Sequence, residues 1–268
     1  MKTYISLFKL RFINSIQYRK AAIAGICTQF FFGFVFISVY LAFYSSTNNT
    51  KLPMNLNELI NYLWLNQAFF ALVYTWYKDK NLINLIKNGN ISYEFIRPIN
   101  FYKKWFSSMY GDRLSAVILR SPLVILIAFF LPKPYNLTLP TSINSVILFI
   151  VFMILSSLLI NAFTMIYHLL IFYTLDEKGI ITLFMVIGEI FAGGTIPIAF
   201  FPKFLRIISS LLPFRYIADL PFRIYSGNFN ITNILPNLIG AIIWLIVLLI
   251  IGNKLTNNIS KKVIVQGG

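Results

Sequence analysis

The chain has 268 residues, of which 58% are hydrophobic and only 12% charged, and its mean hydropathy is +0.74. A soluble domain has about 25% charged residues, so this composition excludes a soluble globular protein and indicates a membrane protein. With one histidine and one cysteine, the chain also lacks the residues for an internal disulfide or a metal site built from several histidines.

The N-terminal segment, residues 1–20, is predicted to form an amphipathic helix on the inner membrane surface. Ile5, Phe8, Phe12 and Ile16 share one helical face, and five lysine or arginine residues accompany them. A basic leader that only sets the orientation of the chain explains the segment equally well, and the two interpretations are compatible.

Six stretches are long and apolar enough to cross the membrane, which takes about 20 mostly apolar residues in a helix. These stretches comprise residues 21–44, 59–77, 114–131, 146–173, 179–201 and 235–251. The third contains Arg120 and Pro122, and Gly193, Gly194 and Pro197 interrupt the fifth. The sequence therefore predicts an all-α membrane protein, a single transmembrane domain over residues 1–268 with six transmembrane helices.

The lysine and arginine residues indicate the orientation of these spans. With the N-terminus inside, 16 of the 23 cations lie in cytoplasmic segments, six lie in outer segments, and Arg120 lies within the third span. Cytoplasmic loops of membrane proteins are enriched in these residues, so both termini are expected in the cytoplasm. Topology then accounts for the net charge of +15, and no nucleic-acid partner is expected.

The largest cytoplasmic segment is predicted over residues 78–112. Asp79 suits the N-cap of a short helix, Gly89 suits its end, and Leu82, Leu85 and Ile86 recur at helical spacing between them. A helix of about ten residues cannot span the bilayer, so we expect its apolar edge to rest on the membrane surface or on a partner protein.

The same segment contains a stiff turn, because Pro98 biases Arg97 towards an extended conformation. A short helix followed by such a turn is typical of a contact module. A merely solvated loop is the alternative interpretation.

The outer segment, residues 192–235, is rich in aromatic residues and interrupted by prolines. Residues 204, 207, 208 and 211 give one apolar helical face between Pro202 and Pro213. The prolines divide the segment into helices too short to cross, and irregular backbone at membrane depth must be surrounded by protein or water. We therefore expect re-entrant outer helices between the fifth and sixth spans.

Polar residues within the fourth span occupy a narrow arc of the helix. They are Ser157, Asn161, Thr164 and His168. Polar side chains are costly against lipid, so this stripe is expected to face protein or water. Interhelical hydrogen bonding and a wall of the substrate path are the two interpretations of the stripe.

Two charges are expected at membrane depth. By the predicted boundaries, Arg120 lies about 10 Å and Glu189 about 15 Å inside the membrane, at 1.5 Å per residue. Arg120 is expected to extend to the inner headgroups, and Glu189 is expected to face a polar cavity. An ion pair between them is the alternative if the third and fifth spans touch.

Two stretches together with the six-span plan resemble the permease subunit of ABC-2 type transporters, in particular those paired with multidrug- or bacteriocin-export ATPases. The first stretch carries a glycine, a spacer and an aliphatic-Arg-Pro motif, at Gly89, Ile96, Arg97 and Pro98. The second carries the family's pattern of glycines, prolines and aromatics, at Gly194, Pro197, Phe201, Pro202, Pro213, Phe214, Pro221, Tyr225 and Gly227.

The resemblance implies a dimer of permeases, with a second copy or a paralogue, in a bacterial cell membrane. It also implies that each permease docks an ABC ATPase subunit through its first cytoplasmic loop. The residues expected to couple to the ATPase are Leu82, Leu85, Ile86, Lys87, Gly89, Glu94, Arg97 and Pro98. The residues expected to line the translocation path are Ser157, Asn161, Thr164, His168, Glu189, Gly193 and Gly194.

The chain has no G-x-x-x-x-G-K-[ST] phosphate loop, so ATP and magnesium are expected on the partner subunit, and no cofactor is expected on this chain. The sequence thus predicts an exporter permease for an amphipathic peptide, drug or lipid-linked substrate. One alternative is an immunity factor of the same fold that expels a toxin from the membrane, and another is an ion-coupled carrier. A membrane enzyme, with His168 activating a serine, is the rival class.

Overall fold

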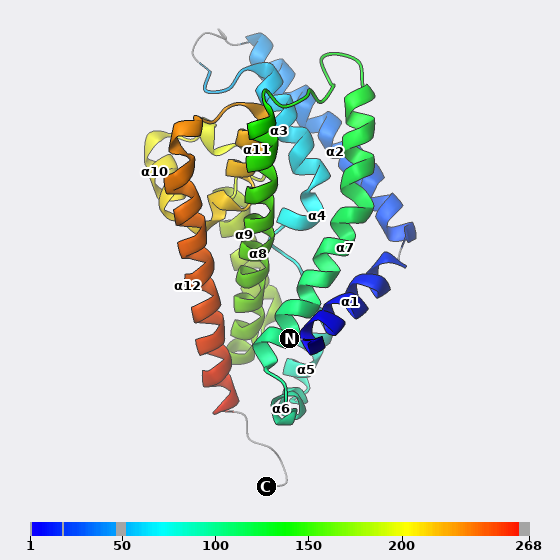
Figure 1. Cartoon of the computed structure of the whole chain (residues 1–268), viewed down its shortest axis with the longest axis vertical. Helices are drawn as coiled ribbons and strands as arrows, with labels where there is room; N and C mark the ends of the chain where they lie inside the picture. The colour runs from blue at the N-terminus through cyan, green and yellow to red at the C-terminus, as the bar shows by residue number, and fades with distance from the viewer. Residues whose placement is uncertain (1, 18, 47–51, 263–268) are drawn as a thin grey trace.

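The computed structural model describes residues 2–17, 19–46 and 52–262, which form an elongated bundle of helices without a strand (Figure 1). Within these ranges four helices are long and apolar enough to cross a membrane. They are α2 (Arg19–Ser46), α7 (Phe101–Phe130), α8 (Ile143–Thr174) and α12 (Ile234–Ser260). The all-α membrane architecture is confirmed, and these four helices correspond to the first, third, fourth and sixth predicted spans.

Helix α8 is the centre of the bundle. It packs against α7, α9, α11 and α12, and most of its residues from Ser156 to Leu169 are buried. By contrast, α2 and α12 expose large apolar side chains, such as Phe31 and Ile243, that suit contact with lipid.

The second predicted span is not one continuous helix. Helix α3 (Leu56–Ala68) stops at Phe69, the single turn α4 (Phe70–Val73) follows, and the backbone is then non-helical as far as Asp79. Thirteen residues of α-helix extend about 20 Å, less than the roughly 30 Å hydrocarbon thickness. The prediction of an unbroken helix over residues 59–77 was therefore wrong.

The fifth predicted span is also shorter than expected. Helix α9 (Glu177–Phe191) begins at the N-cap Asp176 and is followed by Gly193, whose φ of 76° lies in the left-handed region. The helix covers about 22 Å and ends just before the glycines and proline that were predicted to interrupt this span, so the helix alone is too short to cross.

The predicted cytoplasmic segment contains two short helices, α5 (Lys80–Lys87) and α6 (Ile91–Ile96), at one end of the bundle (Figure 1). Helix α7 then begins at Phe101, where the Asn100 side chain accepts a hydrogen bond from the Lys103 amide. The helix thus starts well before residue 114, the predicted beginning of the third span.

The predicted outer segment is a chain of short helices, as the prolines indicated. They are η2 (Ile198–Phe200), α10 (Lys203–Leu211), η3 (Pro213–Tyr216), α11 (Asp219–Ser226) and η4 (Ile231–Asn233). Pro202 is the residue before α10 and Pro213 opens η3, positions where the missing amide of proline costs no helical hydrogen bond. In Figure 1, α10 and α11 lie towards the end of the bundle opposite α5 and α6.

The N-terminal segment is helical, as predicted, in α1 (Lys2–Ile16). It crosses α7 obliquely (Figure 1), and the Phe8 and Tyr110 rings lie 5.9 Å apart. A Cβ added at Gly111 would lie 2.5 Å from the Phe8 carbonyl oxygen, so glycine at this position permits the close approach. Part of the predicted apolar face of α1 therefore packs on protein.

Candidate coupling and transport sites

Helix α5 is anchored to the rest of the chain through its first turn and its apolar face. The Asp79 carboxylate accepts hydrogen bonds from the amides of Asn81 and Leu82, which confirms the predicted N-cap. Leu82 and Ile86 are buried and Leu85 is half-buried, on the side of α5 that packs against α8. The expectation that this apolar edge rests on the membrane surface or on a partner was therefore wrong, because the edge is covered by the chain itself.

Charged residues around α5 and α6 are paired inside the chain. Lys87 lies 3.0 Å from Glu177 at the start of α9. Glu94 is buried and forms ion pairs with Lys104 and, at 3.4 Å, with Arg97. Lys87 and Glu94 thus position the two short helices relative to α7 and α9.

One surface at this end of the bundle remains exposed, and we call it the coupling tip. Tyr93 and Ile96 are each 63% exposed, and the Arg97 side chain is 58% exposed. The coupling tip comprises Gly89, Tyr93, Ile96, Arg97 and Pro98. Two large apolar side chains beside an exposed arginine suit a protein contact.

The coupling tip is connected to the membrane bundle through Asp79 and His168. The Asp79 amide donates a hydrogen bond of 3.0 Å to Nε2 of His168, and Nδ1 of His168 lies 2.8 Å from the Thr164 carbonyl oxygen. Nε2 must therefore be the acceptor and Nδ1 the donor, so the imidazole is neutral. Both ring nitrogens are occupied by backbone groups, which contradicts the serine–histidine enzyme alternative for the described part of the chain.

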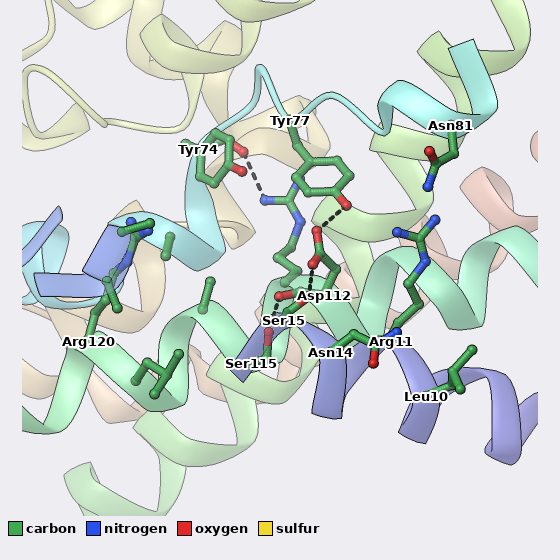
Figure 2. A pocket seen from close by; sticks show the side chains of 16 residues that line it. Leu10, Arg11, Asn14, Ser15, Tyr74, Tyr77, Asn81, Asp112, Ser115 and Arg120 are labelled. Carbon is green, nitrogen blue, oxygen red and sulfur yellow. Dashed lines mark hydrogen bonds between the residues drawn. The ribbon is translucent and has the colours of Figure 1, made fainter. Parts of the chain in front are cut away.

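A pocket of about 630 Å³, which we call the inner cavity, lies between α1, α2, α7 and the segment after α4. Figure 2 shows the polar groups that line it. Arg11 pairs with Asp79 at 3.2 Å, and the Asp112 carboxylate accepts hydrogen bonds from Ser15 and, at 2.5 Å, from Tyr77. These contacts join α1, α7 and the start of α5 in one network.

Arg113 stabilises the non-helical backbone after α3. Its guanidinium donates hydrogen bonds to the carbonyl oxygens of Leu72 and Tyr74, at 2.7 and 3.0 Å, and to the Thr164 hydroxyl at 2.8 Å. It also lies over the rings of Tyr74 and Tyr77, about 5 Å from each centroid. The residue is 1% exposed and lies within α7, so it belongs to a buried helix face and not to a loop as predicted.

The polar stripe on α8 is fully buried and hydrogen-bonded to neighbouring elements. Ser157 contacts the Tyr110 hydroxyl, Asn161 donates to the Phe106 carbonyl, and Thr164 accepts from Arg113. Interhelical hydrogen bonding, the first of the two interpretations, is therefore present, with His168 contributing through Asp79. A role of these four residues in the substrate path stays a prediction.

A second pocket, of about 400 Å³, is lined by residues of α2, α3, α4, α7 and α9, and we call it the membrane cavity. Arg120 and Glu189 both line it, but they form no ion pair in the described structure. A Cβ added at Gly25 would lie 2.8 Å from Cζ of Arg120, so the guanidinium lies over the backbone of α2 inside the bundle. This position differs from the predicted extension to the headgroups. Glu189 faces a cavity as expected, but the walls of that cavity are mostly apolar rather than polar.

Arg120 also lines the inner cavity, at one end of the group in Figure 2, and so stands between the two cavities. Gly194 lines the membrane cavity, and its carbonyl accepts a hydrogen bond of 2.7 Å from Asn66. Gly193 is held by Tyr62, whose hydroxyl donates to its carbonyl at 2.8 Å. Helix α3 thus satisfies the backbone groups freed where α9 ends, as membrane depth requires.

The sequence model of one protein family, described as ABC-2 family transporter protein, matches residues 55–263. The match covers most of the chain, from α3 to the end of α12. This chain belongs to the ABC-2 transporter family. A search of curated proteins finds no similar sequence.

The chain is accordingly a membrane-embedded permease of an ABC transporter, a transport component without catalytic activity of its own. Membership of the family implies an ATPase partner. The family assignment agrees with the resemblance seen in the sequence. The matched region includes the coupling tip and the α3, α7 and α9 walls of the membrane cavity, whereas the α2 wall precedes it.

Two side chains of the permease were missed by sequence reasoning. Arg113 was counted with the loop cations, and nothing local marks it as buried, because its partners lie 39 to 51 residues away. Gln29 lines the membrane cavity, and a primary amide in the middle of an apolar span was a signal that could have identified it.

Proposed function

We propose that this permease is the membrane half of an ATP-driven exporter that moves an amphipathic substrate out of the cell or membrane. Both termini would lie in the cytoplasm of a bacterial cell, and two permeases, identical or paralogous, would pair. ATP and magnesium would bind only to the partner subunit. In this arrangement α3–α4 and α9 act as the second and fifth membrane segments, although each helix is too short to cross alone.

The observation that carries the proposal is the coupling tip. It exposes Tyr93 and Ile96 at the end of the bundle where α5, α6 and the C-terminal end of α12 lie together (Figure 1). The tip follows directly on α5, and the N-cap of α5, Asp79, donates its amide hydrogen bond to His168 of α8. A push from an ATPase on the tip would therefore move α5 and the central helix as one unit.

The inner cavity suits the next step of such a mechanism. Asp79 and Asp112 connect α1 and α7 to the base of α5, so a displacement of α5 would also shift α1. Because Arg120 separates the inner cavity from the membrane cavity, that shift would change access between the two. Substrate would then pass towards the outer helices α10 and α11.

The test uses the tagged full chain, purified from its native membranes in mild detergent. ATP hydrolysis in the eluate is expected, and it should be lost in the double variant Tyr93→Ala/Ile96→Ala. The matched control is Phe204→Ala, which removes an aromatic side chain of similar exposure, 62%, from α10. If the double variant recovers as much ATPase activity as the wild type, the coupling tip is not the docking surface. If transport persists without any ATPase, the chain is not part of an ATP-driven exporter.

A further inference from the structure

The membrane cavity carries an observation that the proposed export function does not explain. Gln29 lies ten residues into α2, about 15 Å from the start of the helix, and is 3% exposed. Neither atom of its amide group, Nε2 or Oε1, has a hydrogen-bond partner among the described residues. An unsatisfied buried polar group costs about 1–3 kcal/mol, and native proteins retain few of them. This amide therefore offers a free donor and a free acceptor to whatever occupies the cavity.

Charges of opposite sign line the same cavity from different helices. Arg120 comes from α7 and Glu189 from α9, and they are not paired with each other. Nε of Arg120 is buried without a hydrogen-bond partner. Each uncompensated charge at membrane depth costs a few kcal/mol, so their presence in one cavity indicates a ligand that pairs with both.

The remaining walls are mostly apolar and aromatic. They include Phe32, Phe36, Phe70 and Trp76. A volume of about 400 Å³ lies within the range of small-molecule sites, which combine apolar walls with a few convergent polar groups. The ligand should accordingly have an apolar or aromatic body.

We propose that the membrane cavity binds a zwitterionic ligand with an apolar body. Its anionic group pairs with Arg120, its ammonium group pairs with Glu189, and the Gln29 amide hydrogen-bonds a polar group, such as a peptide unit, that joins the charged groups to the apolar body. That this ligand is the exported substrate rests on the proposed function; that the cavity binds it does not. The same chemistry occurs in peptides with free termini and in zwitterionic lipid headgroups.

The test measures equilibrium binding to the purified full chain in detergent, without any ATPase, so that the result is independent of the export function. The probe is tritiated phenylalanyl-phenylalanine, compared with its N-acetyl form, which is only an anion, and its C-terminal amide, which is only a cation. Saturable binding of the zwitterion is expected, at least tenfold tighter than that of either blocked form. Addition of short-chain phosphatidylethanolamine tells the two sources apart: displacement of the dipeptide assigns a lipid headgroup, and failure to displace it assigns a peptide-like ligand.

Three variants assign the contacts. Arg120→Gln should lower the affinity for the zwitterion and for the N-acetyl form at least tenfold. Glu189→Gln should lower the affinity for the zwitterion and for the amide form. Gln29→Leu should weaken the zwitterion while thermal stability is retained or raised, because the substitution removes two unsatisfied polar atoms. The control Lys254→Gln removes an exposed charge from α12, which does not line the cavity, and should bind as wild type.

Absence of saturable binding of the zwitterion, or binding that survives both charge substitutions, overturns the proposal. The proposal is also overturned if the N-acetyl form or the amide form binds as tightly as the zwitterion. If Arg120→Gln fails to fold, Glu189→Gln and Gln29→Leu still decide the matter, since each alone must lower the affinity for the zwitterion.

Discussion

Asp79 and His168 lie 89 residues apart in the chain and are joined by a hydrogen bond of 3.0 Å from the Asp79 amide to the imidazole. The carboxylate of the same aspartate caps α5 and pairs with Arg11 of α1. Three elements therefore meet at one residue: the short helix that leads to the coupling tip, the N-terminal helix and the central helix α8.

Removal of the imidazole should weaken this junction. In His168→Ala, the buried Asp79 amide loses its acceptor, at a cost of about 1–3 kcal/mol. We expect a lower thermal midpoint in detergent and reduced substrate-stimulated ATP hydrolysis in the assembled transporter. His168→Gln is the matched control, because its amide oxygen can accept the same hydrogen bond, and its thermal midpoint should lie nearer to wild type. Equal behaviour of the alanine variant and wild type would show that the hydrogen bond contributes nothing.

Arg113 should be more important for stability than any other arginine that the structure describes. In Arg113→Met, the carbonyl oxygens of Leu72 and Tyr74 and the Thr164 hydroxyl lose their donor. With about 1–3 kcal/mol for each unsatisfied buried group, we expect a loss of several kcal/mol, measured as thermal unfolding in detergent. Arg206→Met on α10 is the comparison, since that guanidinium is only part-buried. A smaller loss in Arg113→Met than in Arg206→Met would refute this ranking.

The contact of α1 with α7 should depend on glycine at position 111. The Cβ in Gly111→Ala would meet a backbone oxygen at 2.5 Å, which cannot move without displacing α1. We expect faster tryptic cleavage at Lys9 and Arg11 in the purified variant. The control Ser107→Ala lies on the same helix and adds no atom, so its cleavage rate should equal that of wild type. Unchanged cleavage in Gly111→Ala would mean that α1 tolerates the displacement.

The orientation of the bundle can be tested by cysteine labelling in a Cys27→Ala background. Lys203→Cys and Asn230→Cys, both at exposed positions, should react with a membrane-impermeant maleimide in intact cells. Lys80→Cys, at the start of α5, should react only after the cells are permeabilised. Labelling of Lys80→Cys in intact cells, or protection of Lys203→Cys, would reverse the proposed topology.

Local signals in the sequence predicted the local features of the fold well. Asp79 and Gly89 delimit α5 as expected, and the prolines of residues 192–235 divide that segment into short helices. Glu189 was expected to face a cavity because a carboxylate at membrane depth is costly against lipid, and it lines one, although the walls of that cavity are mostly apolar. In each case the residue and its immediate neighbours contain the physical reason.

Features that depend on distant partners could not be predicted. No glycine or proline marks the break at Phe69 in the sequence. The non-helical backbone after the break is stabilised by Arg113, which lies about 40 residues later in the chain than Leu72 and Tyr74, whose carbonyl groups it binds. The burial of Leu82 against α8 is of the same kind, since a helical apolar face does not reveal which surface covers it.

The dependence of the broken α3–α4 segment on Arg113 also constrains how the permease is made. The ribosome synthesises the carbonyls of Leu72 and Tyr74 about 40 residues before the guanidinium that binds them. Until α7 has been synthesised, these carbonyl groups would be unpaired if α3–α4 entered the hydrocarbon. The nascent chain is therefore more stable with α3–α4 at the polar membrane interface. We therefore expect α3–α4 and α7 to enter the bilayer together, as one late step of biogenesis rather than as two successive helices.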